Sequence, residues 1–261
     1  MDLARLPLPA VDILFDDLDL GPPPQPFDVP VVGDTVEERQ RLRETIHRTL
    51  GRSGVLRAGR VDPTIEDALV VLARAPFVLT ATGDVDRAPL LARACSDGRD
   101  AVLARQHGNH LAVGLVRPTA VVPAIVDLLP DIPPGRGASL TMPAAQHQPP
   151  SRDEDDYDPL AAARDRPTAG GSERAVARIF GRPRLGFGAL TASVRQAAPG
   201  GEQRWHRLGQ LTWWDIQQEN GAGPGRWFTT TSGDPPQLSL HPGDNARLAG
   251  YLQQLVGPHL P

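Results

Sequence analysis

The chain has no lysine, so all 27 of its basic residues are arginines, and 31 acidic residues outnumber them. The net charge of −4 offers no basic field of the kind that nucleic-acid binding needs. A single cysteine, Cys95, excludes an internal disulfide framework. No apolar run approaches the ~18 residues of a membrane span, and the first residues lack the layout of a signal peptide. We therefore expect a cytoplasmic protein with no nucleic-acid partner and no membrane insertion.

The residue patterns that carry catalysis are also missing. The chain contains no Gly-x-Ser-x-Gly elbow, no Ser-x-x-Lys pair and no Walker A loop. His107 and His110 flank a tight turn, but a metal site needs three or four ligands. The acidic run at residues 153–156 lacks the spacing and central glycine of a calcium loop. Cys95 falls in a predicted strand, which favours a buried, inert thiol. We predict no catalytic residue, no metal, no cofactor and no enzymatic activity.

The clearest pattern that is present lies in residues 225–261. It predicts a strand at 227–231, a Gly-Pro-rich turn, a strand at 238–240 and a helix opened by Pro242, since proline suits the first helical turn. The helix has one apolar face with helical spacing, made of Leu248, Tyr251, Leu252, Leu255 and Val256. The first half of the chain holds a looser version of this unit, which suggests two related half-domains.

In the first half, residues 1–34 are predicted to be irregular, because Gly21 and three prolines after it break any element. Thr35 and Glu38 form a capping box that opens a helix, which Gly51 can end. A second helix opens at residues 62–63 and stops before Pro76. Further expected elements are strands at 77–82 and 88–94 around a turn at 83–86, a hairpin of 101–106 with 110–116, and a helical stretch at 118–129 that Pro123 interrupts.

Residues 131–171 are acidic, rich in proline and poor in large apolar side chains, so we expect a mobile linker with one helical turn at 160–164. A helix at 172–180 and four strands follow, at residues 185–196, 205–218, 226–231 and 237–240. In the second of these strands, period-two alternation places one group on a single face: Leu208, Thr212, Trp214 and Ile216.

Each half therefore runs helix, antiparallel strands, helix, because every connection between strands is short. We predict an α+β fold, with an antiparallel β-sheet, packed helices and halves related by a pseudo-twofold axis. The prediction is a single domain over residues 1–261, with one half at about 35–130, the mobile linker at about 131–171 and the other half at about 172–257.

Two adjacent tryptophans, Trp213 and Trp214, are predicted on one strand, where neighbouring side chains face opposite sides of the sheet. One ring then belongs to the core. The other faces a second layer of the same chain, a partner or solvent, and an exposed tryptophan would be a good binding anchor.

Several stretches resemble the EspG family of ESX (type VII) secretion-associated proteins. The segment Pro30…Gly33-x-Thr35-x-x-Glu38-Arg39 is similar to an early motif of that family. Residues 50–72 resemble its Gly-then-Leu-rich helix, and residues 101–130 resemble its strand pair and helix ending in Leu-Leu-Pro. Residues 225–228 and 238–244 resemble its Gly-Arg-aromatic strand and its Pro-x-Asp helix start. The resemblance covers most of the chain, at residues 29–130 and 172–257.

This resemblance implies a cytoplasmic, chaperone-like adaptor that binds the tip of the PPE subunit in PE–PPE heterodimers, keeps them soluble and aids their delivery. The family's contact surface implies roles for the central sheet, an early loop and the C-terminal helices. The candidates for partner-binding residues at these places are Gly83, Asp84, Val85, Asp86 and Arg87 in the turn, with Trp213 and Trp214 on the sheet; they are placed by location and not by a matching motif. A ligand-sensing or other non-enzymatic interaction protein without a secretion role is the alternative.

Overall fold

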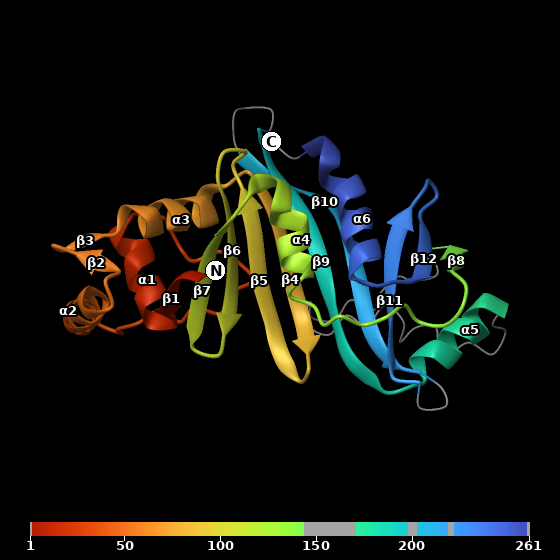
Figure 1. Ribbon diagram of the computed structural model, residues 1–261. Coiled ribbons are helices and arrows are strands. Elements are labelled where there is room, and N and C mark those ends of the chain that lie inside the picture. Colours follow the sequence, from red (N-terminus) through yellow and green to blue (C-terminus); the bar gives the residue numbers. More distant parts are fainter. Residues whose placement is uncertain (1, 144–170, 198–202, 219–221, 260–261) are drawn as a thin grey trace.

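A ten-stranded antiparallel sheet forms the centre of the computed structural model, which describes residues 2–143, 171–197, 203–218 and 222–259 (Figure 1). The first repeat comprises α3 (Pro63–Arg74), β4 (Phe77–Val85), β5 (Ala88–Ser96), β6 (Ala101–His107), β7 (His110–Val116), η1 (Pro118–Ala120) and α4 (Val121–Val126). The second comprises α5 (Gly171–Phe180), β9 (Arg184–Ala197), β10 (Gln203–Gln217), β11 (Pro224–Ser232), β12 (Gln237–Pro242) and α6 (Asn245–Val256). A short turn of helix, η5 (Gly257–His259), follows α6.

The strand order is β1-β7-β6-β5-β4-β9-β10-β11-β12-β8. The first strands of the two repeats, β4 and β9, pair antiparallel at the centre, and each repeat then winds outward through its own meander. This order is the one that two halves related by a twofold axis between β4 and β9 produce. The predicted α+β fold with an antiparallel sheet and packed helices is confirmed.

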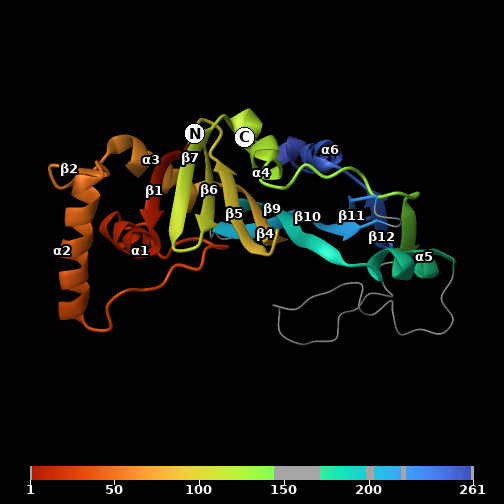
Figure 2. The ribbon, with the colours of Figure 1, turned by 60° about the horizontal axis from the view of Figure 1, so that its bottom comes forward.

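The two faces of the sheet carry different layers. On one, called the covered face below, α4 and α6 lie side by side across the central strands and pack on odd-numbered residues of β4 and even-numbered residues of β9 (Figure 1). On the opposite face, α1 and α3 pack over one end of the sheet and α5 over the other. Figure 2 shows α5 on the other side of the sheet from α4 and α6. The middle of this second face lies between α1 and α3 on one side and α5 on the other.

The N-terminal residues are ordered, contrary to the prediction that residues 1–34 are irregular. β1 (Asp2–Pro7) pairs with β7 at the sheet edge, and α1 (Leu8–Asp17) buries one side in the core. The prediction failed because the break at Gly21 and the prolines after it comes after both elements and does not prevent them. Pro9 lies in the first turn of α1, where its missing N–H costs no hydrogen bond.

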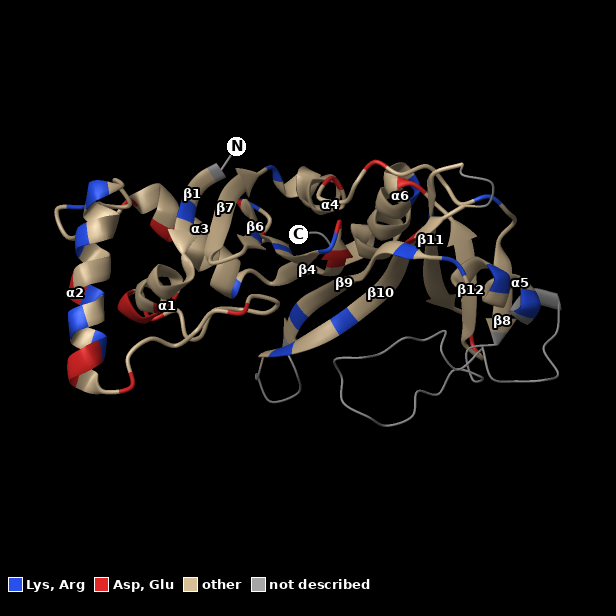
Figure 3. Cartoon of the chain, turned by 90° about the horizontal axis from the view of Figure 1, so that it is seen from below, with Lys and Arg blue, Asp and Glu red and all other residues tan. Residues whose placement is uncertain are grey.

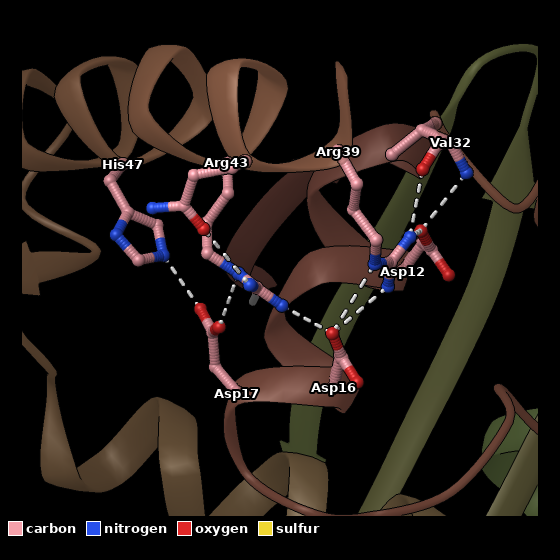
Figure 4. A network of polar contacts seen from close by, with 8 residues as sticks. Asp12, Asp16, Asp17, Val32, Arg39, Arg43 and His47 are labelled. Atoms are coloured by element: carbon pink, nitrogen blue, oxygen red, sulfur yellow. Dashed lines mark hydrogen bonds and ion pairs between the residues drawn. The ribbon is translucent and has the colours of Figure 1, made fainter. Parts of the chain in front are cut away.

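α2 (Val36–Arg52) is a polar helix that docks on α1 through charges (Figure 4). Arg39 donates to Asp12 and to the Val32 carbonyl, both at 2.8 Å, and to Asp16 at 3.1 Å. Arg43 pairs with both Asp16 and Asp17, and His47 Nε2 lies 2.6 Å from Asp17 Oδ2. The Thr35 cap is confirmed, since its hydroxyl accepts from the Glu38 N–H at 3.1 Å. A small hairpin, β2 (Leu56–Arg57) with β3 (Arg60–Val61), joins α2 to α3.

Part of the predicted linker is built into the sheet. Pro134 forms a bridge with Arg226, and β8 (Leu140–Pro143) pairs with β12 at the second sheet edge. For residues 131–143 the prediction of a mobile linker is therefore wrong. The acidic run and the predicted helical turn at 160–164 lie outside the described residues.

Three details of the other predicted strands and helices differ. Pro242 ends β12, and Asp244 caps α6 by accepting from the Arg247 N–H at 2.9 Å, because a carboxylate satisfies a free helical donor. β4 continues to Val85, into the predicted turn at 83–86. Leu208 is not on the face of Thr212 and Trp214, because a bulge between Arg207 and Gly209 shifts the alternation.

Candidate protein-binding surface

The central strands leave a band of side chains between the two helical groups, on the face opposite α4 and α6. We call this band the open strip. Its members project from alternate positions of β4, β9 and β10 and are mostly half-buried: Thr80, Thr82, Asp84, Phe187, Ala189, Thr191, Ser193, Gln210 and Thr212. Registers Thr80↔Thr191 and Thr82↔Ala189 bring them into cross-strand pairs. Threonine is β-branched and carries a hydroxyl group, so it suits a sheet surface that is partly exposed to water.

Two large apolar side chains mark the ends of this region. Phe187 on β9 and Trp205 on β10 are each 46% exposed, although most aromatic residues of the described chain are buried. Phe187 lies opposite Asp84 of β4, and Trp205 lies opposite Arg195 of β9. Exposed aromatic rings at both ends of a polar band are typical of a surface that another molecule covers.

Glycines allow the central strands to approach closely under the Phe187 end. A Cβ on Gly83 would lie 2.2 Å from the Phe187 carbonyl oxygen, and one on Gly188 would lie 2.3 Å from the Thr82 carbonyl oxygen. The Gly188 Cβ would also meet Trp213 at 3.0 Å on the covered face. The Gly83↔Gly188 pair therefore holds β4 and β9 together where any side chain would push the backbones apart.

The predicted turn residues lie at this same end. Gly83, Asp84 and Val85 belong to β4, and the two-residue turn is Asp86-Arg87 with φ of 52° and 63°. Positive φ at both central residues is the geometry of a type I′ hairpin turn, which suits Asp86 better than Arg87. Because Asp84 is paired with Phe187, the hairpin tip continues the open strip.

The two predicted tryptophans are both covered by the chain itself. Trp213 is 0% exposed on the covered face, and the Arg226 guanidinium lies 5.3 Å from its ring centroid. Trp214 is 2% exposed and meets Phe180 of α5 edge-on, with ring centroids 5.0 Å apart. Helices of the same chain thus cover both tryptophan rings. Neither ring presents a surface, and both belong to the core, Trp213 on the covered face and Trp214 under α5 beside the strip.

A buried ion pair fixes the covered face beside Trp213. Arg226 Nε and Nη2 donate to Asp215 Oδ1 and Oδ2 at 2.7 and 2.9 Å. Arg226 also donates to Asn245 at the start of α6 and to the Pro130 carbonyl after α4. Burial raises the pKa of Asp215, and the hydrogen bonds from Arg226 oppose that shift. One guanidinium therefore ties β10, β11, α6 and the segment after α4 together.

The chain is similar to known proteins in sequence and in fold. The model of the EspG family matches residues 7–254. The chain belongs to the EspG family. A search of curated proteins found no match. Among solved structures, the chain is similar to the Mycobacterium tuberculosis type VII secretion system chaperone EspG5, solved in complex with a PE25-PPE41 dimer. The identity is 12%, the TM-score is 0.63, and the match covers 99% of this chain and 96% of that one, which shows a shared fold.

The described part of this EspG-family chain offers no cluster of three or more His, Cys, Asp or Glu side chains that could hold a metal ion. His107 and His110 form the terminal pair of the β6–β7 hairpin. Cys95 is fully buried, as predicted, and burial raises the pKa of its thiol to about 12, which disfavours the reactive thiolate. Among the helices of the described residues, none is both long and apolar enough to cross a membrane.

Sequence reasoning missed the two exposed aromatic residues of this EspG-family chain. In β9, the buried residues Leu190, Ala192 and Val194 fall on even positions, so an odd-numbered Phe187 was a signal for an uncovered face. For Trp205 the signal was weaker, because the bulge after Arg207 changes the alternation between Trp205 and the buried end of β10.

Proposed function

We propose that this EspG-family chain is a non-enzymatic, chaperone-like adaptor of a type VII secretion system. In this proposal it works in the cytoplasm and binds the PPE subunit of a PE–PPE heterodimer, which keeps the pair soluble and aids its delivery. Support comes from the family membership over residues 7–254 and from the fold shared with EspG5, which was solved with PE25-PPE41 bound.

The observation that carries the proposal is the open strip with its two exposed aromatic residues. At a rise of ~3.4 Å per residue, the distance along β9 from Phe187 to Arg195 is roughly 27 Å. Helices are ~10 Å wide, so the strip has room for the end of a helical pair. An apolar helical tip in water is an aggregation hazard, and a sheet face that covers it removes that surface from water.

We place the Gly83–Arg87 hairpin end within the same contact surface. Asp84 and Phe187 lie side by side on paired strands, and the exposed Arg87 projects beyond them. Trp213 and Trp214, also predicted as partner-binding residues, act in this proposal only indirectly: Trp213 packs on the covered face behind the strip, and Trp214 packs against Phe180 of α5 beside it.

The test is co-expression with the PE–PPE pairs encoded near the gene. We expect a soluble one-to-one complex with at least one pair, and no turnover of substrates. Phe187→Arg should abolish the complex, because it replaces an exposed apolar anchor of the contact by a charge. The matched control is Leu115→Arg, since Leu115 is 49% exposed on β7, three strands away from β4. If no pair gains solubility or co-elutes with the wild-type chain, the adaptor function is wrong.

A small-molecule sensing function has one observation in its favour. A cleft of about 370 Å³ lies between β12 and α6 and is lined by Ser139, Phe228, His241, Arg247 and Tyr251, among others. That volume is in the range of ligand sites. A shift in melting midpoint on screening metabolites, lost in Tyr251→Ala, would favour this alternative if no PE–PPE pair binds.

A further inference from the structure

The Trp205 end of the open strip combines an exposed ring with two arginines. The guanidinium carbons of Arg195 and Arg93 lie 4.8 and 5.8 Å from the centroid of the indole. Arg195 is the cross-strand neighbour of Trp205, whereas Arg93 belongs to β5, three strands away in the sheet. The indole and the Arg93 guanidinium therefore meet although β9 and β4 lie between their strands. The ring thus has two guanidinium groups from different strands beside it.

The positive charge at this end has no carboxylate partner among the described residues. No ion pair found between described residues involves Arg93, Arg195 or Arg207. Arg93 is 6% exposed, donates to the Gln25 carbonyl at 3.1 Å and leaves Nε without a hydrogen bond. Burial lowers the pKa of Arg93, and the nearby charge of Arg195 lowers it further.

The exposed arginine Arg207 adds to the same end of the sheet. In Figure 3, blue arginine positions lie near the adjoining ends of β9 and β10. Because like charges collect here around a low-dielectric aromatic surface, a bound anion would relieve their repulsion and satisfy free N–H donors.

We infer that this end of the strip is a carboxylate-binding subsite, formed by Arg195, Arg207 and Trp205 with Arg93 behind them, which receives an acidic side chain of the bound partner. The inference rests on the proposed function and adds a specificity determinant to it. A carboxylate fits because a guanidinium fork binds it through two parallel hydrogen bonds, while the indole contacts its methylene stem. A nucleic-acid strand fits less well, since the chain is net negative and the cations are confined to one end of the sheet.

The experiment measures the affinity of the wild-type chain for a co-purifying PE–PPE pair at several salt concentrations. Arg207→Glu and Arg195→Glu should each weaken binding by about 10-fold or more and flatten its salt dependence, because charge reversal repels the carboxylate. Arg117→Glu, at an exposed arginine after β7, is the matched control and should bind as wild type. Trp205→Leu should weaken binding without changing the salt dependence.

The partner side of the experiment identifies the anion. Each Asp and Glu of the PPE tip is replaced by its amide, and one replacement should reproduce the loss and show no further loss with Arg195→Glu. Replacing that same acidic residue by Arg should restore binding to the Arg195→Glu chain. If the wild-type chain binds and both charge reversals bind equally well, with unchanged salt dependence, the subsite is wrong while the adaptor function stands. If the wild-type chain binds no pair, the adaptor function itself is wrong.

Discussion

The two faces of the central strands differ, although alternate residues of the same strands form both. On the covered face, Leu79, Leu190 and Trp213 are fully buried under α4 and α6. On the open strip, the alternating partners of those residues are Thr80, Thr191 and Thr212, which are half-buried. The apolar content of a face thus follows from whether a helix of the same chain covers it. A strand face built from threonine tolerates water until a partner arrives, whereas the covered face cannot be exposed without loss of the core.

The largest expected effect is on the polar centre of the covered face. Arg226→Ala should lower the free energy of unfolding by about 3–5 kcal/mol, because it leaves the buried Asp215 carboxylate without its partner. Chemical denaturation of the purified variant measures this. Arg117→Ala, at an exposed position, should stay within about 0.5 kcal/mol of wild type. An Arg226→Ala loss as small as that of Arg117→Ala would mean that the ion pair does not hold this face together.

Leu252→Ala tests the apolar part of the same face. Leu252 is 0% exposed on α6, so its truncation should destabilise the protein by about 2–5 kcal/mol through lost burial and a cavity. The melting midpoint and the denaturation midpoint should both fall. An unchanged midpoint would show that α6 is only loosely attached, and the contrast between the two faces would disappear.

Thr191→Val makes the corresponding change on the open strip. Valine keeps the β-branched shape, and the Thr191 hydroxyl has no side-chain hydrogen bond within the described part of the chain, so stability should stay within about 0.5 kcal/mol of wild type. The same denaturation experiment serves, with Leu252→Ala measured in parallel. A loss above ~2 kcal/mol would indicate that the strip is part of the core, and it would weaken the case for a partner there.

The smallest expected effect is on pH dependence at the edge of the covered face, where His241 stacks near Phe228 with centroids 5.2 Å apart. Burial lowers the pKa of His241 below its ordinary 6.5. As pH falls below about 6.5, the unfolded chain takes up a proton that the folded chain resists, so stability decreases on acidification. His241→Gln should flatten the stability curve between about pH 5 and 7. If stability depended on pH equally in both proteins, the imidazole would be exposed to water in the folded protein.

Much of the fold could be predicted, because local patterns decide it. Thr35 and Glu38 cap α2 as their spacing predicts, and the hairpin around Gly108-Asn109 forms where two strand patterns meet. The errors occur where a distant element determines the outcome. β1 and β8 are short, and they become strands because β7 and β12 offer unpaired edges. Pro242 stays in β12 because Trp227 pairs with it, although its local sequence suits a helix start.

For the candidate site, a binding role of Gly83–Arg87 stays a prediction, whereas the two predicted tryptophans are buried and Phe187 and Trp205 are the exposed rings. Whether Trp214 or Trp205 is exposed depends on where α5 packs, and Phe180 of α5 packs against the Trp214 ring. Period-two alternation shows that adjacent residues face apart, and it carries no information on which face a helix will cover.

The sequence by itself therefore determined most helices and strands of the two halves and their antiparallel pairing, since capping residues, turns and periodicity act over a few positions. Only the tertiary structure decided that β4 and β9 meet at the centre, that Arg226 joins four elements, and that Trp205 gathers Arg93 and Arg195 around it. The physical reason is that these contacts join residues far apart in the chain. They are stabilised by burial and by interactions between charges that only the fold brings together, so no local sequence pattern predicts them.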